Sequence, residues 1–142
     1  MEEGKFPMRA VSAAFAGAVL MASVSSAFGQ APPQPQNPFE GVWTGSIEQS
    51  GAKSYRVLLT IGANGFVTQY PELTCNGRLT PVGFSGEFAF FTETIEQGRA
   101  DSGGTCVDGS ITLAITADSI AYGWFGVYQG ELLQARGLLI RQ

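Results

Sequence analysis

Few residues in this sequence are of types that could do chemistry, and the two cysteines, Cys75 and Cys106, come first among them. Two thiols can form a structural disulfide, act as a redox couple or contribute to a metal site. The sequence lacks the C-x-x-C spacing of redox couples, and it has no histidine or third cysteine to complete a metal site. We therefore predict a structural disulfide between Cys75 and Cys106, with no metal and no cofactor.

A carboxylate, Glu93, is the second candidate. It occupies an alternating position of an apolar, strand-like segment, so its side chain points either into the core or to solvent. An inward carboxylate would need a partner such as Arg56, Arg78 or Arg99, because an unpaired buried charge is costly. The pattern favours the other outcome, a surface glutamate or a structural salt bridge.

Enzymatic chemistry finds little support in the sequence. Without histidine, a serine or cysteine hydrolase would need an atypical base, and both cysteines are expected to be oxidised. No spacing singles out a pair of acidic residues for glycoside hydrolysis. The sequence predicts no catalytic residue and a protein that is not an enzyme.

These residues lie in a chain whose apolar and polar side chains alternate between closely spaced turn signals. This pattern predicts an all-β domain without helices. The expected strands span residues 39–49, 55–61, 66–70, 77–82, 87–95, 107–116, 120–125 and 131–141. Short connections favour an eight-stranded antiparallel up-and-down barrel, which leaves no free sheet edge; a β-sandwich is the alternative. Tyr70-Pro71 is expected to end the third strand.

An up-and-down barrel has connections at two alternating ends. Tight turns at Asn64-Gly65, Phe84-Ser85 and Asp118-Ser119 would share one end, and the longer loops would share the other, here called the loop-rich end. Cys75 and Cys106 both fall at the loop-rich end, as a disulfide between them requires.

The loop-rich end is also where a small barrel would take a ligand. Candidate rim residues are Lys53, Glu72, Arg99, Asp101, Tyr128 and Gln129. The alternative is that they are solvated loop side chains. The aromatic residues that either line an apolar pocket or fill the barrel are Trp43, Phe88, Phe90, Phe91, Tyr122 and Trp124. Their density favours a filled barrel.

The N-terminal part of the chain reads as an export signal. Met8-Arg9 precedes an apolar run over residues 10–24, which is short for a membrane span, and Ala27-Phe28-Gly29 offers a cleavage site. We predict a cleaved signal peptide over 1–29, a Pro/Gln-rich linker over 30–38 and one barrel domain over 39–142. A buried N-terminal helix is the alternative, and either Met1 or Met8 is the start.

Export and charge together limit the partners. The formal net charge is −4 without a basic cluster, so neither nucleic acid nor an anionic membrane surface is an expected partner. We predict a periplasmic or secreted monomer without a membrane span after signal cleavage. Its partner would be an unknown small ligand or an envelope protein.

Two resemblances add to this interpretation. Gly41-Val42-Trp43 resembles the Gly-x-Trp that opens the first strand of lipocalins, avidins and related small barrels. The resemblance implies a calycin-like barrel in which Trp43 plugs the closed end under an arginine of the last strand, Arg141 or Arg136.

The second resemblance spans about residues 39–141, and it is to a small extracytoplasmic domain. That domain is found at the C-termini of some bacterial serine/threonine kinases and alone in exported proteins. The matching residues are Phe39 to Gly45, Tyr70, Pro71, Leu73, Cys75, Gly77, Leu79, Glu93 to Ile95, Cys106 to Gly109, and Trp124. It implies a disulfide-bearing sensor or binding module, although this sequence has no kinase part.

Three functions follow from the sequence. The favoured one is a non-catalytic binding or sensor-like module. The second is a periplasmic protease inhibitor whose segment 30–38 would enter a protease cleft. The third is a structural envelope protein without a small-molecule pocket.

Overall fold

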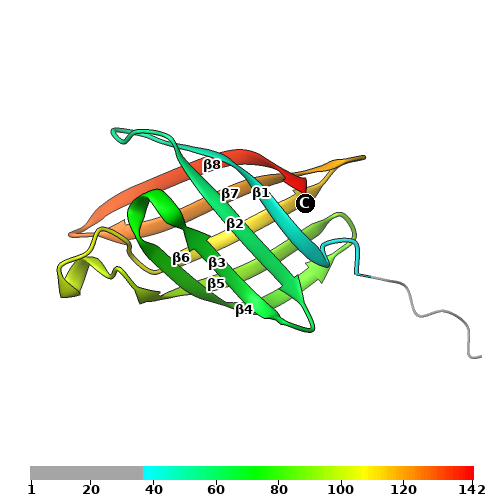
Figure 1. Cartoon of the computed structure of the whole chain (residues 1–142), viewed down its shortest axis with the longest axis horizontal. Helices are drawn as coiled ribbons and strands as arrows, with labels where there is room; N and C mark the ends of the chain where they lie inside the picture. Colours follow the sequence, from blue (N-terminus) through cyan, green and yellow to red (C-terminus); the bar gives the residue numbers. More distant parts are fainter. Residues whose placement is uncertain (1–36) are drawn as a thin grey trace, which may run out of the picture. The chain divides into compact units, whose positions relative to one another are not determined.

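Eight antiparallel strands in sequential order form a closed barrel in the computed structural model, which describes residues 37–142 (Figure 1). Pairing of the last strand with the first closes the sheet, so the sandwich alternative is wrong. The strands are β1 (Gly41–Gln49), β2 (Tyr55–Gly62), β3 (Gly65–Tyr70), β4 (Cys75–Ser85), β5 (Phe88–Gln97), β6 (Gly109–Ile115), β7 (Ser119–Tyr128) and β8 (Glu131–Arg141). Two single turns of 3-10 helix interrupt the loops: η1 (Pro71–Leu73) and η2 (Ala100–Ser102).

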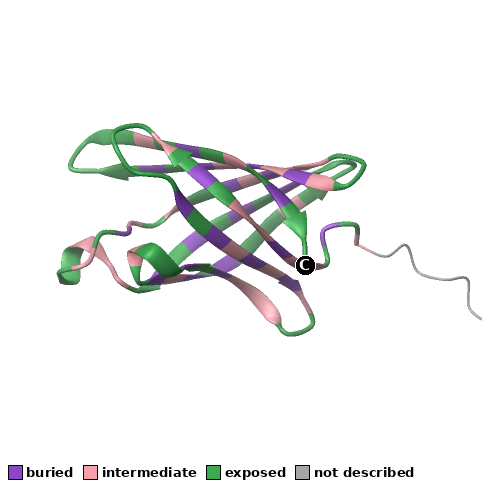
Figure 2. Cartoon of the chain, turned by 45° about the horizontal axis from the view of Figure 1, so that its top comes forward, coloured by how far each residue is buried: buried purple, intermediate pink, exposed green. Residues whose placement is uncertain are grey.

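Alternation along each strand builds the core. Buried and more exposed positions alternate along the strands (Figure 2). In β2 the buried positions are Tyr55, Val57, Leu59 and Ile61, and the residues between them are less buried. The same alternation recurs in β5 and β7, so the inward faces form one apolar cluster. Burying each large apolar side chain contributes roughly 1.5–3 kcal/mol, which makes this cluster the main source of stability.

The tight turns lie at one end, as predicted, but their positions differ from those expected. Gly65 is the first residue of β3 and Ser119 is the first residue of β7, so these two turns comprise Ala63-Asn64 and residues 116–118. Phe84 and Ser85 belong to β4, and the turn falls at Gly86-Glu87, where Gly86 has a φ of +56°. A register shift between Pro81 and Gly83 marks a β-bulge, which lets β4 continue past the proline instead of ending there.

Trp43 and Arg141 close the end that carries the tight turns. The Arg141 guanidinium lies 4.3 Å from the centre of the Trp43 ring, and the Trp43 indole donates to the Phe39 carbonyl at 2.9 Å. Arg141 also donates to the carbonyl of Glu40. The predicted stack is therefore present with Arg141, while Arg136 is exposed on the outside of β8. Glycine suits position 41 because its φ is +137°, which residues with a side chain rarely adopt, and because a Cβ would also meet the Arg141 guanidinium.

The disulfide joins Cys75, the first residue of β4, to Cys106 in the loop before β6. Their Cα atoms are 6.5 Å apart, and the pair closes a sequence separation of 31 residues at the loop-rich end. The loop packs tightly there, since a Cβ on Gly98 would come within 2.6 Å of the Cys75 sulfur. The predicted disulfide is confirmed, and it is consistent with an oxidising location outside the cytoplasm.

The predicted signal peptide and most of the linker, residues 1–36, lie outside the described residues. Within residues 37–142 no helix has the length and hydropathy needed to cross a membrane.

Removing the disulfide should lower stability markedly. In the chain-entropy account a loop of this length contributes roughly 3–4 kcal/mol, so a Cys75→Ser, Cys106→Ser variant should melt on the order of 10–20 °C lower. Thermal denaturation followed by circular dichroism measures this. Reductant should lower the melting temperature of the wild type and leave that of the variant unchanged. Unchanged melting of a wild type whose thiols are shown to be free would contradict the stabilising role.

Candidate functional site

The side chain of Glu93 points into the barrel and is only 2 % exposed. The expectation of a surface glutamate or salt bridge is therefore wrong. The alternation of β5 places Glu93 on the same face as Phe91 and Ile95, so strand geometry, not pairing to a cation, decides its direction.

None of the arginines considered as partners reaches Glu93. Each one instead binds a carboxylate at the surface: Arg78 pairs with Glu96 at 2.6 Å, Arg56 with Glu72 at 3.9 Å, and Arg99 with both Asp101 at 3.0 Å and Asp108 at 2.7 Å. Among residues 37–142 no lysine or arginine forms a salt bridge with Glu93. The described part of the chain thus supplies no counter-charge in a salt bridge with this carboxylate.

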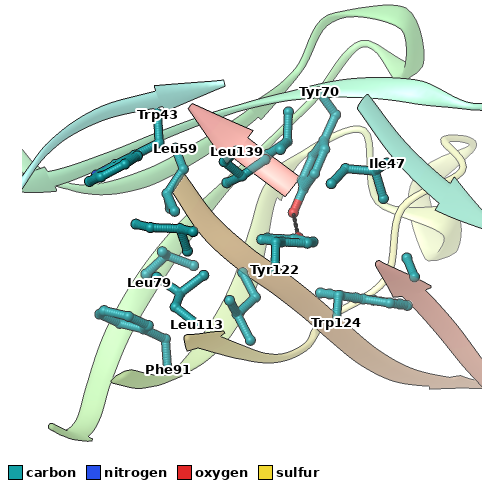
Figure 3. Packing of buried hydrophobic residues seen from close by; sticks show 14 of the residues in the cluster. Trp43, Ile47, Leu59, Tyr70, Leu79, Phe91, Leu113, Tyr122, Trp124 and Leu139 are labelled. Carbon is teal, nitrogen blue, oxygen red and sulfur yellow. Dashed lines mark hydrogen bonds between the residues drawn. The ribbon is translucent and has the colours of Figure 1, made fainter. Parts of the chain in front are cut away.

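Neutral donors hold Glu93 instead. Its Oε1 accepts from the Thr68 hydroxyl and from the Tyr70 hydroxyl at 2.7 Å, and its Oε2 accepts from the Trp124 indole at 2.8 Å. Because Tyr70 has a single proton and donates it to Glu93, the Tyr122 hydroxyl must donate to Tyr70 across their 2.9 Å contact (Figure 3). Tyr122, Tyr70 and Glu93 therefore form a continuous chain of hydrogen bonds that ends at the carboxylate.

Three glycines leave the space that this arrangement needs. A Cβ on Gly77 would lie 2.8 Å from Oε1 of Glu93 and 2.7 Å from the Thr68 hydroxyl oxygen. Gly109 and Gly126 flank the indole of Trp124, where a Cβ on either would come within 2.6 Å of ring carbons. Small residues on β4, β6 and β7 therefore fit the network, which is a reason for glycine inside a strand.

Burial has the largest effect on the pKa of the Glu93 carboxyl group. Desolvation raises the pKa of its carboxyl above the usual range, the hydrogen bonds from Thr68, Tyr70 and Trp124 oppose the rise, and the charge of Asp108 adds to it. Burial, assisted by the charge of Glu93, raises the pKa of Tyr55 to about 12. Burial also places the pKa values of Tyr70 and Tyr122 well above the ordinary tyrosine value.

A small pocket opens over Glu93 at the loop-rich end. Its volume is about 50 Å³, and its walls include Tyr55, Tyr70, Trp124 and Cys106. The exposed Thr105 lies at its edge. This space accepts a few solvent-sized groups. It is far below the roughly 300–1,000 Å³ of pockets for drug-sized ligands.

The candidate rim residues do not line this pocket, although all lie at the loop-rich end. Arg99 and Asp101 are engaged with each other, and the Glu72 carboxylate accepts from the Arg56 amide. Lys53, Tyr128 and Gln129 are exposed, and Gln129 donates to the Tyr128 hydroxyl at 3.4 Å. The structure does not bring the six together into one site.

The predicted interior aromatics divide into two groups. Trp43, Phe91, Tyr122 and Trp124 are buried inside, but Phe88 and Phe90 face outward and are 47 % and 38 % exposed. Including both in the interior was wrong, because Phe90 and Phe91 are adjacent and must lie on opposite faces of β5.

Sequence reasoning missed several residues of the network: Tyr55, Thr68, Tyr122 as a hydrogen-bonding group, and Gln49, whose side-chain oxygen accepts from the Tyr55 hydroxyl at 2.8 Å. A signal existed, since Thr68 and Tyr70 are separated by two positions on one strand and therefore share a face. Tyr70 is likewise more than a strand end. Its hydroxyl contacts both Glu93 and Tyr122.

No group of three or more acidic or cysteine side chains within residues 37–142 is placed to hold a metal ion. Comparison of the chain with models of known protein families found no match. Searches of curated proteins and of solved structures found no match either. The resemblances to calycins and to the kinase-linked domain thus remain predictions.

The titration of Glu93 should make the free energy of unfolding depend on pH. Because its pKa is raised in the folded state, the native protein binds this proton more tightly than the unfolded chain. The associated stabilisation is complete below about pH 4.3, the ordinary glutamate pKa, and is lost as pH rises through the raised native value. The unfolding free energy of the wild type, relative to Glu93→Gln, should therefore fall between pH 4 and 8. Urea denaturation across this range measures it.

Glu96→Gln, which removes an exposed carboxylate of the same strand, is the control. An equal pH dependence for both variants would contradict the assignment.

The space left by Gly77 should contribute to the stability of the fold. A methyl group there meets the Glu93 carboxylate and the Thr68 hydroxyl, so Gly77→Ala should destabilise the fold by about 1–3 kcal/mol. Gly83→Ala, also in β4 but in open space, is the control and should change the unfolding free energy by less than about 1 kcal/mol. Equal losses in the two variants, measured by urea denaturation, would show that the effect is general to the strand.

Proposed function

We propose that this protein is an exported, non-catalytic binding module of the periplasm or extracellular space, and that its ligand site is the pocket over Glu93. The observation that carries the proposal is a buried carboxylate in the lining of a pocket open to solvent, with no salt bridge to any lysine or arginine among residues 37–142. The disulfide supports the location, since such bonds persist in oxidising compartments.

A purely structural role explains this carboxylate less well. Removing a carboxylate from water is costly, and an apolar side chain of similar volume often serves a core as well or better. The donors from Thr68, Tyr70 and Trp124 also leave no buried side-chain polar atom unpaired among the described residues. A buried polar network that carries the desolvation cost of a carboxylate and lies beside a solvent-accessible pocket is typical of a ligand-binding site.

The size of the pocket limits what enters it. At about 50 Å³ it accepts one small functional group, while the rest of a larger ligand would lie over the loop-rich end. The remainder of the barrel interior holds the side chains of the apolar cluster. The site is thus a pocket at the barrel mouth, unlike the deep cavity of a barrel that encloses its ligand.

The proposal assigns no catalytic step. The hydroxyls of Tyr55 and Tyr70 have raised pKa values, so neither is a ready base or nucleophile near neutral pH. The protease-inhibitor alternative depends on segment 30–38, of which residues 30–36 lie outside the described residues, and it stays a prediction. The structural-protein alternative is an outcome of the experiment below.

The two tryptophans provide a direct test. The Trp124 indole lies at the pocket, and the Trp43 indole lies at the closed end, so each N–H resonance reports one end of the barrel. Titration with small cationic, neutral and anionic organic probes, followed by two-dimensional NMR of ¹⁵N-labelled protein, should shift the Trp124 signal with at least one class. The Trp43 signal should stay in place.

A blocking variant completes the experiment. Val107 is half-buried at the pocket, so Val107→Trp should abolish the shift; Val127→Trp, on the exposed outer face of β7, should leave it intact. If no class of probe shifts Trp124, the site does not bind small groups and the structural-protein alternative is favoured.

A further inference from the structure

We infer that the pocket recognises a protonated amine, so that an ammonium group of the ligand supplies the positive charge that Glu93 lacks. This inference rests on the binding function proposed above and names the chemical class of its ligand. The pocket combines a carboxylate in its lining, aromatic side chains in its walls, and hydroxyl and indole donors that are already used. Each of these features favours an ammonium group.

The first feature is the unused capacity of the carboxylate. Oε1 of Glu93 already accepts from Thr68 and Tyr70, but Oε2 accepts only from Trp124. A carboxylate oxygen has room for two donors, so Oε2 can accept one more. Charge-assisted hydrogen bonds between an ammonium and a carboxylate are about twice as strong as neutral ones, which makes a cation the best occupant.

The second feature is the supply of donors around Glu93. The hydroxyls of Thr68 and Tyr70 and the indole of Trp124 all donate to the carboxylate, and the Tyr55 hydroxyl donates to Gln49. These groups have no further proton to offer, so the donors left in the pocket wall are the side chains of Gln49 and Thr105. The hydroxyl oxygens of Thr68 and Tyr55 can still accept, whereas that of Tyr70 already accepts from Tyr122. A ligand that donates therefore fits here, and an ammonium offers three donors and no acceptor. A carboxylate or phosphate would meet acceptors and a negative charge.

The third feature is the aromatic wall. The rings of Tyr55 and Tyr70 meet edge to face with centroids 5.9 Å apart, and Trp124 lines the same pocket. Aromatic faces attract cations by roughly 0.5–2 kcal/mol, and Trp does so best. The surroundings are also negative, because Asp108 lies close enough to raise the pKa of Glu93 and the whole chain carries a net charge of −4.

Within the described part of the chain no lysine or arginine competes for this position, since none forms a salt bridge with Glu93. Arg99, the arginine of the neighbouring loop, is committed to Asp101, Asp108 and the carbonyl of Ile95. The small pocket volume excludes bulky substituents on the nitrogen. The expected group is therefore a primary ammonium, with the rest of the ligand extending over the loop-rich end.

Three probes of equal chain length test the inference: n-butylammonium, n-butanol and butyrate. Titrations of the full-length protein, read from the Trp124 indole signal, should show n-butylammonium binding at least ~10-fold tighter than n-butanol, with butyrate not binding. If n-butanol or butyrate binds best, the ammonium inference is overturned and the pocket remains a binding site. If none of the three binds the Trp124 pocket, both the inference and the proposed function fail.

Charge variants assign the effect to Glu93. Glu93→Gln should weaken n-butylammonium binding by at least ~10-fold. Glu96→Gln removes the same charge from an exposed site on the same strand and should change it less than about twofold. Equal effects would show that general electrostatic attraction, and not Glu93, selects the cation.

A pH titration keeps the inference testable if Glu93→Gln does not fold. Affinity of the wild type for n-butylammonium should fall as pH is lowered through the raised pKa of Glu93, since the probe keeps its charge. The titratable groups facing Glu93 are Tyr55, Tyr70 and Tyr122, which stay neutral there, and Asp108, which is paired with Arg99. An affinity that is constant from pH 8 to 4 would overturn the inference.

Discussion

The hydrogen-bonded Glu93 carboxylate connects more of this barrel than any other polar group described above. Its donors come from β3 and β7, it belongs to β5, and the space it needs is left by a glycine of β4. The indole that donates to it is flanked by glycines of β6 and β7. One side chain therefore constrains the inner faces of five consecutive strands. A buried network with every member satisfied gives this kind of rigidity, because any shift leaves a polar group unpaired.

The two ends of the barrel differ in how their charged side chains are partnered. At the closed end a cation, Arg141, lies over Trp43 and donates to backbone carbonyls, so charge and aromatic surface satisfy each other within the chain. At the loop-rich end the Glu93 carboxylate lies beside Trp124, and no lysine or arginine of residues 37–142 forms a salt bridge with it. The first arrangement is complete in itself. The second leaves an acceptor free beside a pocket, and this asymmetry locates the proposed site.

The disulfide and the loop around it set the shape of the pocket. Cys106 forms part of its wall, and the bridge fixes the loop before β6 against the start of β4. Arg99 adds a second restraint by joining Asp101 and Asp108 to the Ile95 carbonyl. Two of the six candidate rim residues, Arg99 and Asp101, thus hold the loop in place. The proposed binding site is formed instead by residues deeper in the barrel.

The sequence by itself determined the all-β class, the order of the strands, the tight turns at one end and the pairing of Cys75 with Cys106. These depend on local rules: alternation of side chains, turn residues and the fixed alternation of connections in a meander. It also indicated the Trp43–Arg141 stack through the Gly-x-Trp resemblance. Only the tertiary structure decided the direction of Glu93 and the identity of its partners. A period of two places Glu93 on the same face as Phe91 and Ile95, but Phe88 and Phe90 make the opposite face of β5 apolar as well, so the pattern alone does not say which face is buried. The donors come from strands distant in sequence, whose meeting depends on the closed barrel's register and on the space left by Gly77.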